Sequence, residues 1–128
     1  MTIVAASPLI TKGQDKSPTN QKYIKGLIKE FKFKYPDLVF HIYAKESGFG
    51  SSRLALEDNN LFGMKYPSKR YTRAKYKTSS GFAGYSSIKD SFLDFKLYEL
   101  KYLQNKSRQE YERYLKDVYS LDKNYFLK

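Results

Sequence analysis

The feature that most constrains the fold is the stretch at residues 61–86, where helical periodicity stops. Leu61-Phe-Gly-Met64 and Phe82-Ala-Gly-Tyr85 are short apolar segments with glycine, and Ser79-Ser-Gly81 is a turn signal. We therefore expect a small lobe of two or three antiparallel strands. Helices are predicted on both sides of it, so the pattern favours an α+β fold: a mainly helical domain with a small antiparallel β-lobe flanking a cleft.

Two helices and a short one are predicted before the lobe, from apolar residues at helical spacing. Ser17-Pro18 is expected to open the first, with Ser17 as the N-cap, and its apolar face extends to Phe31. The second begins at Pro36 and stops before Gly48, a residue type that commonly ends helices. A short helix is expected at 52–57.

Two further helices are predicted after the lobe. Ser87 to Asp90 has the form of a capping box, and the helix it opens extends to about Leu103. Its apolar residues occupy two faces, which indicates a helix buried in the middle of the domain. Ser107 to Glu110 is a second capping box, and the chain from Tyr119 is expected to start as a loop.

Length and composition limit the classes of function. With 128 residues the chain is expected to form an N-terminal arm, 1–16, and one domain, 17–128, that acts as a monomer. The absence of cysteine excludes disulfides and thiolate chemistry, and a single histidine argues against zinc, so no cofactor is expected. The net charge of +11 favours an anionic partner such as nucleic acid, a membrane surface or an acidic wall polymer, although solubility alone also explains it.

Glu46 is the first candidate for catalysis. It follows Val39, Ile42 and Tyr43 at spacings that place it on their apolar helix face. Apolar neighbours and the negative end of a helix both disfavour a charged carboxylate. A carboxyl kept protonated near neutral pH is what a glycosidase acid requires. The alternative is an ordinary glutamate in a last helical turn, reaching water or Lys45.

Four motifs in order resemble those of the bacterial peptidoglycan glucosaminidases, glycoside hydrolase family 73. They are Glu46-Ser-Gly-Phe-Gly-Ser-Ser52, Asn59-Asn-Leu-Phe-Gly-Met-Lys65, Tyr85-Ser-Ser-Ile-Lys-Asp-Ser91 and Tyr119-Ser-Leu-Asp-Lys-Asn-Tyr125. The last departs from the family's pattern, with Lys123 in place of proline. The resemblance covers roughly residues 20–128 and implies a lysozyme-like fold.

The resemblance also implies an activity and site residues. It implies hydrolysis of the β-1,4 bond after N-acetylglucosamine in the glycan strands of peptidoglycan, with Glu46 as the general acid. The residues that it implies for substrate binding are Phe49, Asn60, Phe62, Tyr85, and Tyr119 or Tyr125. For the aromatic residues among them, core packing is the alternative role.

One departure bears on the mechanism. Some members of the family carry a second acidic residue in the β-lobe, but this sequence has no Asp or Glu between Asp58 and Asp90. Three interpretations stay open: Glu57 or Asp58 orients the water; the acetamido group of the substrate attacks, with a tyrosine assisting; or the protein binds without cleaving. The hypothesis we favour is one essential glutamate with assistance from the substrate or a tyrosine.

Other functions compete with this one. A lytic transglycosylase or muramidase on the same fold also begins with Glu-Ser, but usually continues to a Gly-Leu-Met-Gln type of stretch. The charge and the basic, aromatic run from Lys65 to Lys77 fit nucleic-acid binding. However, no nucleic-acid-binding motif is visible, so nucleic acid is not expected as a partner. A non-catalytic component that binds the wall is a third class.

The expected place of action is the bacterial cell wall, in the periplasm or outside the cell. No apolar run in the sequence is long enough to span a membrane, and residues 1–8 are not expected to act as a signal peptide. The resulting expectation is a phage-encoded protein, one delivered by a virion or a secretion apparatus, or an isolated domain.

Overall fold

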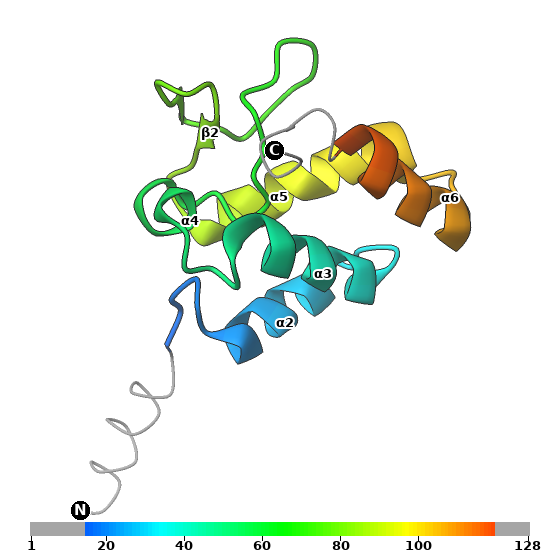
Figure 1. The fold of residues 1–128 in the computed structure, drawn as a ribbon, viewed down its shortest axis with the longest axis horizontal. Helices are drawn as coiled ribbons and strands as arrows, with labels where there is room; N and C mark the ends of the chain where they lie inside the picture. The colour runs from blue at the N-terminus through cyan, green and yellow to red at the C-terminus, as the bar shows by residue number, and fades with distance from the viewer. Residues whose placement is uncertain (1–14, 120–128) are drawn as a thin grey trace, which may run out of the picture.

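The computed structural model describes residues 15–119 and shows a helical body with a small β-lobe (Figure 1). In chain order its elements are α2 (Gln21–Glu30), α3 (Pro36–Ser47), α4 (Arg53–Asp58), β1 (Tyr76–Lys77), β2 (Ala83–Gly84), α5 (Ile88–Tyr98), the π-helix η1 (Glu99–Leu103), α6 (Arg108–Tyr114) and the π-helix η2 (Leu115–Tyr119). This is the predicted α+β, lysozyme-like class. Tyr125 and nearly all of the predicted arm, residues 1–14, lie outside the described residues.

The first helix begins later than predicted. Its N-cap is Asn20, whose side chain accepts a hydrogen bond from Tyr23 N at 3.1 Å, and not Ser17. The carbonyl of Pro18 instead accepts a hydrogen bond from the Tyr43 hydroxyl at 2.6 Å, so residues 17–19 form a turn held against α3. A contact with a distant helix thus overrides the local signal.

Helix α3 matches the prediction closely. Pro36 is its first residue, and Gly48 ends it in the left-handed conformation with φ of 58°. A non-glycine residue is strained at that φ, which explains why the helix ends there. Val39, Ile42, Tyr43 and Glu46 are all buried, so the predicted shared face is confirmed.

The β-lobe contains two short antiparallel strands. Tyr76 pairs with Gly84 and Lys77 with Ala83, and an isolated bridge joins Lys65 to Phe82. The lobe stands at one end of the helical body, next to α4 and α5 (Figure 1). The prediction of two or three strands is therefore confirmed.

The long helix after the lobe runs as predicted from Ile88 to Leu103, its last five residues as the π-helix η1. Two details of the prediction were wrong. Only one face is buried: Phe92 and Phe95 are fully covered, whereas Leu100 is 44% exposed. The Ser87 side chain caps the helix, but the Asp90 carboxylate lies 3.7 Å from Arg73 and no capping box is closed.

The last helix has the complete capping box predicted at Ser107 and Glu110. The predicted loop at Tyr119 was wrong, because Tyr119 is the last residue of η2 and is fully buried. Its hydroxyl donates a hydrogen bond to the carbonyl of Phe62, which holds the end of η2 against the second motif.

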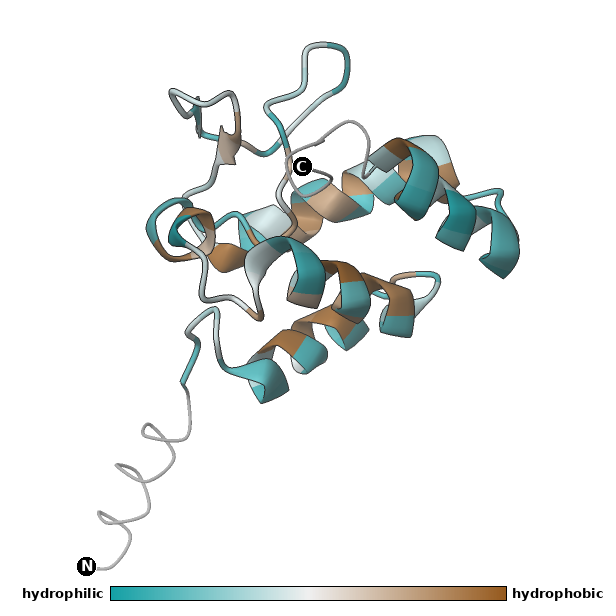
Figure 2. Cartoon of the chain, in the orientation of Figure 1, coloured by the Kyte–Doolittle hydropathy of each residue, from teal (hydrophilic) through white to brown (hydrophobic). Residues whose placement is uncertain are grey.

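Aromatic rings pack against one another in the core. The ring of Phe62 stacks on Phe95 with centroids 4.6 Å apart, and Phe92 meets Phe62 edge-on at 5.0 Å. The apolar faces of α2 and α3 point inward and their charged faces outward (Figure 2). Among the described helices, none has the length and apolar content that crossing a membrane requires.

Candidate active site

Glu46 is a carboxylate held inside the protein at the end of α3. It lies in the last turn of the helix, two residues before Gly48, and is 8% exposed. Val39, Ile42 and Tyr43 precede it on the same buried face. Burial of an acidic side chain is costly, so a buried carboxyl in a helix end is a candidate for a functional role.

The turn after Glu46 is fixed by side chains within the first motif. The Ser47 hydroxyl donates to the carbonyl of Tyr43 at 2.6 Å and accepts a hydrogen bond from Gly50 N at 2.8 Å. Tyr43 itself is held by its bond to Pro18, and burial raises the pKa of Tyr43 to about 12, so its hydroxyl stays a donor. These hydrogen bonds hold the backbone next to Glu46 in place.

Phe49 is the exposed member of this turn. Its φ is 55°, which is unusual for a residue with a side chain, and the residue is 47% exposed. The ring lies edge-on to Tyr43 at 6.3 Å and tilted to Phe40 at 6.2 Å. Phe49 is therefore exposed in this turn, and its role in substrate binding stays a prediction.

Asn60 and Phe62 of the second motif are buried. Asn60 is 1% exposed; its Nδ2 donates to the carbonyls of Met64 and Ala83 at 2.9 and 2.8 Å, and its Oδ1 accepts from Met64 N at 3.0 Å. Phe62 is fully covered. These side chains hold the motif loop to β2 and to the core, so in this structure they face protein; their role in substrate binding stays a prediction.

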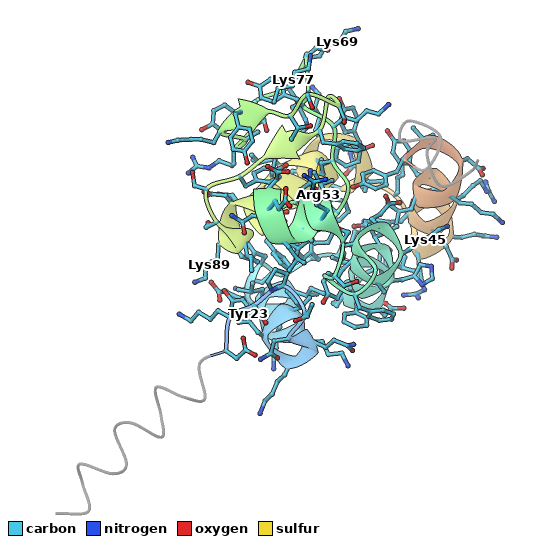
Figure 3. All side chains as sticks on the ribbon, turned by 60° about the vertical axis from the view of Figure 1, so that its left-hand side comes forward. Tyr23, Lys45, Arg53, Lys69, Lys77 and Lys89 are labelled. Atoms are coloured by element: carbon cyan, nitrogen blue, oxygen red, sulfur yellow. The ribbon has the colours of Figure 1, made fainter. Side chains whose placement is uncertain are left out.

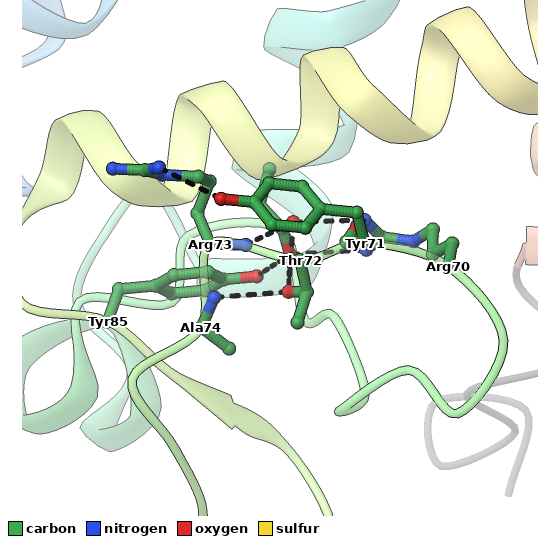
Figure 4. Close-up of polar contacts among 7 residues, drawn as sticks. Arg70, Tyr71, Thr72, Arg73, Ala74 and Tyr85 are labelled. Carbon is green, nitrogen blue, oxygen red and sulfur yellow. Dashed lines mark hydrogen bonds and ion pairs between the residues drawn. The ribbon is translucent and has the colours of Figure 1, made fainter.

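Tyr85 belongs to a buried polar cluster that ties the β-lobe to α5. Its hydroxyl donates to the carboxylate of Asp94, a fully buried side chain on α5. Three lobe residues converge on the same carboxylate (Figure 4): Arg70 with two bonds of 2.9 and 3.1 Å, Thr72 through its hydroxyl, and Arg73 through its backbone N–H.

The Asp94 carboxylate of this cluster is a buried charge that is balanced by hydrogen bonds and by a positive side chain. Burial raises the pKa of the Asp94 carboxyl, but hydrogen bonds from Arg70 and Tyr85 and the positive charge of Arg70 outweigh it and leave the pKa below its usual value. Burial, and then the neighbouring Asp94 charge, raise the pKa of the Tyr85 hydroxyl. Asp94 is therefore a charged anchor for the lobe.

The two acidic residues that precede the lobe differ in position. The Glu57 carboxylate is 58% exposed and pairs with Arg53 at 3.0 Å on the surface of α4. The Asp58 carboxylate accepts a hydrogen bond from the Tyr76 hydroxyl of β1, and the Asp58 carbonyl accepts one from Tyr85 N. Of the two, only Asp58 is connected to the β-lobe by these bonds.

Several cavities lie beside these elements, and two of them border the lobe–helix junction or the helix of Glu46. One of about 370 Å³ separates the lobe loop from the ends of α5 and α6, at the lobe–helix junction where a cleft was expected. A second, of about 470 Å³, lies between α3 and α6. It is lined in part by His41, Ile42 and Lys45, which lie within the five residues before Glu46. His41 is exposed at its rim.

Comparison with known proteins decides the family. A model of the family described as glucosaminidase, mannosyl-glycoprotein endo-beta-N-acetylglucosaminidase, matches residues 21–128. The chain belongs to this family, glycoside hydrolase family 73. Membership supports a glycoside hydrolase related to peptidoglycan, and the match begins where α2 begins and contains all four motifs.

One relative among curated proteins supports the assignment. Protein bax of Escherichia coli (strain K12) is 46% identical over 54 residues, which is 42% of this chain and 19% of that protein. The chain thus spans only about a fifth of that relative's length. No solved structure matches the chain.

Sequence reasoning missed the Asp94 cluster of this glucosaminidase domain. Asp94 stands between Phe92 and Phe95, two residues on the buried face of a predicted helix, and a charge in that position is the sequence signal for a buried ion pair. Arg70 entered the prediction only as part of the basic, aromatic run from Lys65 to Lys77. Its side chain is 5% exposed, so it is a buried structural residue.

Proposed function

We propose that this chain hydrolyses the β-1,4 bond after N-acetylglucosamine in peptidoglycan glycan strands, with Glu46 as the general acid. The observation that carries the proposal is the burial of Glu46, 8% exposed, at the end of α3 within the residues that the family model matches. A carboxyl in that setting is suited to giving up a proton, unlike one solvated on the surface.

In the proposed reaction Glu46 donates its proton to the glycosidic oxygen as the bond from that oxygen to C1 breaks. The carbonyl oxygen of the substrate's own 2-acetamido group attacks C1 from the other face, forming an oxazolinium ring. Water then attacks C1 and opens the ring, and the Glu46 carboxylate takes the proton from that water. The acetamido group is restored and the configuration at C1 is retained.

This route is supported by the lack of a second acid in the lobe. No Asp or Glu occurs between Asp58 and Asp90. Asp94 is the buried carboxylate nearest to the lobe in sequence, and it already accepts hydrogen bonds from Arg70, Thr72 and Arg73. The Asp58–Tyr76 pair is the remaining candidate for positioning the water from the lobe side. In this proposal Phe49 supplies an exposed ring for sugar contact. Asn60, Phe62, Tyr85 and Tyr119 contact protein in this structure, and a role for them in substrate binding stays a prediction.

Product analysis tests the bond and the mechanism class. Purified peptidoglycan is digested, the fragments are reduced, and their ends are identified by mass spectrometry. The proposal predicts that N-acetylglucosamine occupies the reducing end and is converted to its alditol. Reduced N-acetylmuramic acid would assign a muramidase, and an anhydro sugar would assign a lytic transglycosylase.

A further inference from the structure

The cavity between the β-lobe loop and the helix ends has two unlike walls. One is made by the loop that contains Lys65 and Lys69, and the other by tyrosines of α5, η1 and α6: Tyr98, Tyr102 and Tyr114. Its volume of about 370 Å³ falls within the range of small-ligand sites, roughly 300–1,000 Å³. The function proposed above does not assign a role to this cavity.

The tyrosine wall offers aromatic surface. The rings of Tyr98 and Tyr102 lie 4.7 Å apart, and Tyr114 lies nearly parallel to Tyr102 at 6.5 Å. Tyr98 is mostly covered and forms the floor, whereas Tyr102 is 36% exposed at the rim. Rings of this kind combine apolar faces with hydroxyl groups that form hydrogen bonds.

The opposite wall is cationic and has no internal counter-charge. Lys65 and Lys69 are exposed, and the described residues that line the cavity include no Asp or Glu. Figure 3 shows Lys69 projecting from the tip of the lobe. Arg70 also lines the cavity, but its guanidinium is bound to Asp94 and lies 5.7 Å from the ring of Tyr98, which makes it a fixed part of the wall.

We propose that this cavity is a subsite for the acidic stem peptide attached to the muramyl sugar next to the cleaved bond. The inference rests on the proposed function, which supplies peptidoglycan as substrate. N-acetylglucosamine carries no charge, so the two exposed lysines that line this cavity have no complementary charge on that sugar. The stem peptide offers carboxylates for Lys65 and Lys69 and aliphatic side chains for the faces of Tyr102 and Tyr114.

The test measures binding by the Glu46→Gln protein, which separates binding from cleavage. The probes are N-acetylmuramyl-L-alanyl-D-glutamate and the same compound with both carboxylates converted to amides, titrated while backbone amide NMR signals are followed. We expect the acid to bind more tightly than the diamide and to shift signals from Lys65 to Arg70 and at Tyr102. Adding the double substitution Lys65→Gln and Lys69→Gln to this protein should raise Kd for the acid roughly three- to tenfold. Kd for the diamide should not change.

The matched control is Lys75→Gln with Lys77→Gln, which removes the same charge from the same lobe without touching the cavity. An equal loss of binding in both double variants, or no loss in either, overturns the inference. Hydrolysis of purified peptidoglycan by the wild type is measured alongside. Its absence refutes the proposed function itself, whereas normal hydrolysis with unchanged binding in the Lys65/Lys69 variant refutes only the subsite.

Discussion

At the scale of single residues, Asp94 carries the clearest structural consequence. Its carboxylate is fully buried and bound by Arg70, whose side chain is 5% exposed. Asp94→Asn would leave that guanidinium buried without its counter-charge, so we predict a loss of about 3–5 kcal/mol in the free energy of unfolding, measured with urea. Asp90→Asn is the control, because its partner Arg73 is 3.7 Å away and half-exposed, and it should cost under about 1 kcal/mol. Equal effects would contradict the assignment of Asp94 as the lobe anchor.

The same residue predicts a pH dependence. The pKa of Asp94 in the folded protein lies below its ordinary value of 3.8, because hydrogen bonds and the Arg70 charge outweigh the effect of burial. A group with a depressed folded pKa contributes stability above its unfolded pKa and loses it as pH falls through the folded value. The stability difference between wild type and Asp94→Asn should therefore be full at pH 7 and shrink below about pH 4. A difference that grows in acid would contradict the charged state proposed for Asp94.

Asp58 tests the role of acids other than Glu46. Under the substrate-assisted route Asp58→Asn keeps an acceptor for the Tyr76 hydroxyl and should lower kcat less than about tenfold. The exposed Glu57→Gln serves as the control with the same charge change. A loss of a hundredfold or more in Asp58→Asn alone would assign the general base to Asp58.

At the scale of elements, two glycines predict opposite effects of the same substitution. In Gly26→Ala, inside α2, the added Cβ meets nothing within 4 Å, so better helix propensity should stabilise the protein by about 0.5–1 kcal/mol. In Gly50→Ala the added Cβ would approach the Pro18 carbonyl oxygen to 2.0 Å at a φ of +82°. We expect at least about 2 kcal/mol of destabilisation there, measured by thermal and urea unfolding. A neutral Gly50→Ala would contradict the close packing of the turn after Glu46 against residues 17–19.

The elements also show what could be read from the sequence. The end of α3 at Gly48 and the capping box at Ser107 follow from local chemistry, and both were predicted. The start of α2 at Asn20 depends on the Pro18 carbonyl bonding to Tyr43, 25 residues away, and was missed. The Arg70–Asp94 pair is 24 residues apart and was missed for the same reason, since it exists only once the lobe packs on α5.

The candidate site divides along the same line. The burial of Glu46 could be predicted, because Val39, Ile42 and Tyr43 set the phase of its helix. The hydrogen bonds from the Asn60 amide to the carbonyls of Met64 and Ala83 could not be predicted. The motif is compatible with either a ligand contact or a structural bond at Asn60.

At the scale of the whole molecule, the charge of +11 predicts salt-sensitive attachment to the wall. Raising the salt from about 0.1 M to about 1 M shortens the screening length from about 10 Å to about 3 Å. We expect the Glu46→Gln protein to bind purified peptidoglycan roughly three- to tenfold more weakly over that range, measured by co-sedimentation. Binding to uncharged chitin should change less than about twofold, and equal salt effects on both polymers would contradict an electrostatic contribution from the wall.

The central claim for the whole molecule is one essential glutamate. The most direct test is release of soluble fragments from purified peptidoglycan by wild type, Glu46→Gln and the exposed control Glu57→Gln, each checked for folding by circular dichroism. We predict a loss of at least about 10² in rate for Glu46→Gln and near-normal activity for Glu57→Gln. A folded Glu46→Gln protein that cleaves peptidoglycan at the wild-type rate would contradict the claim.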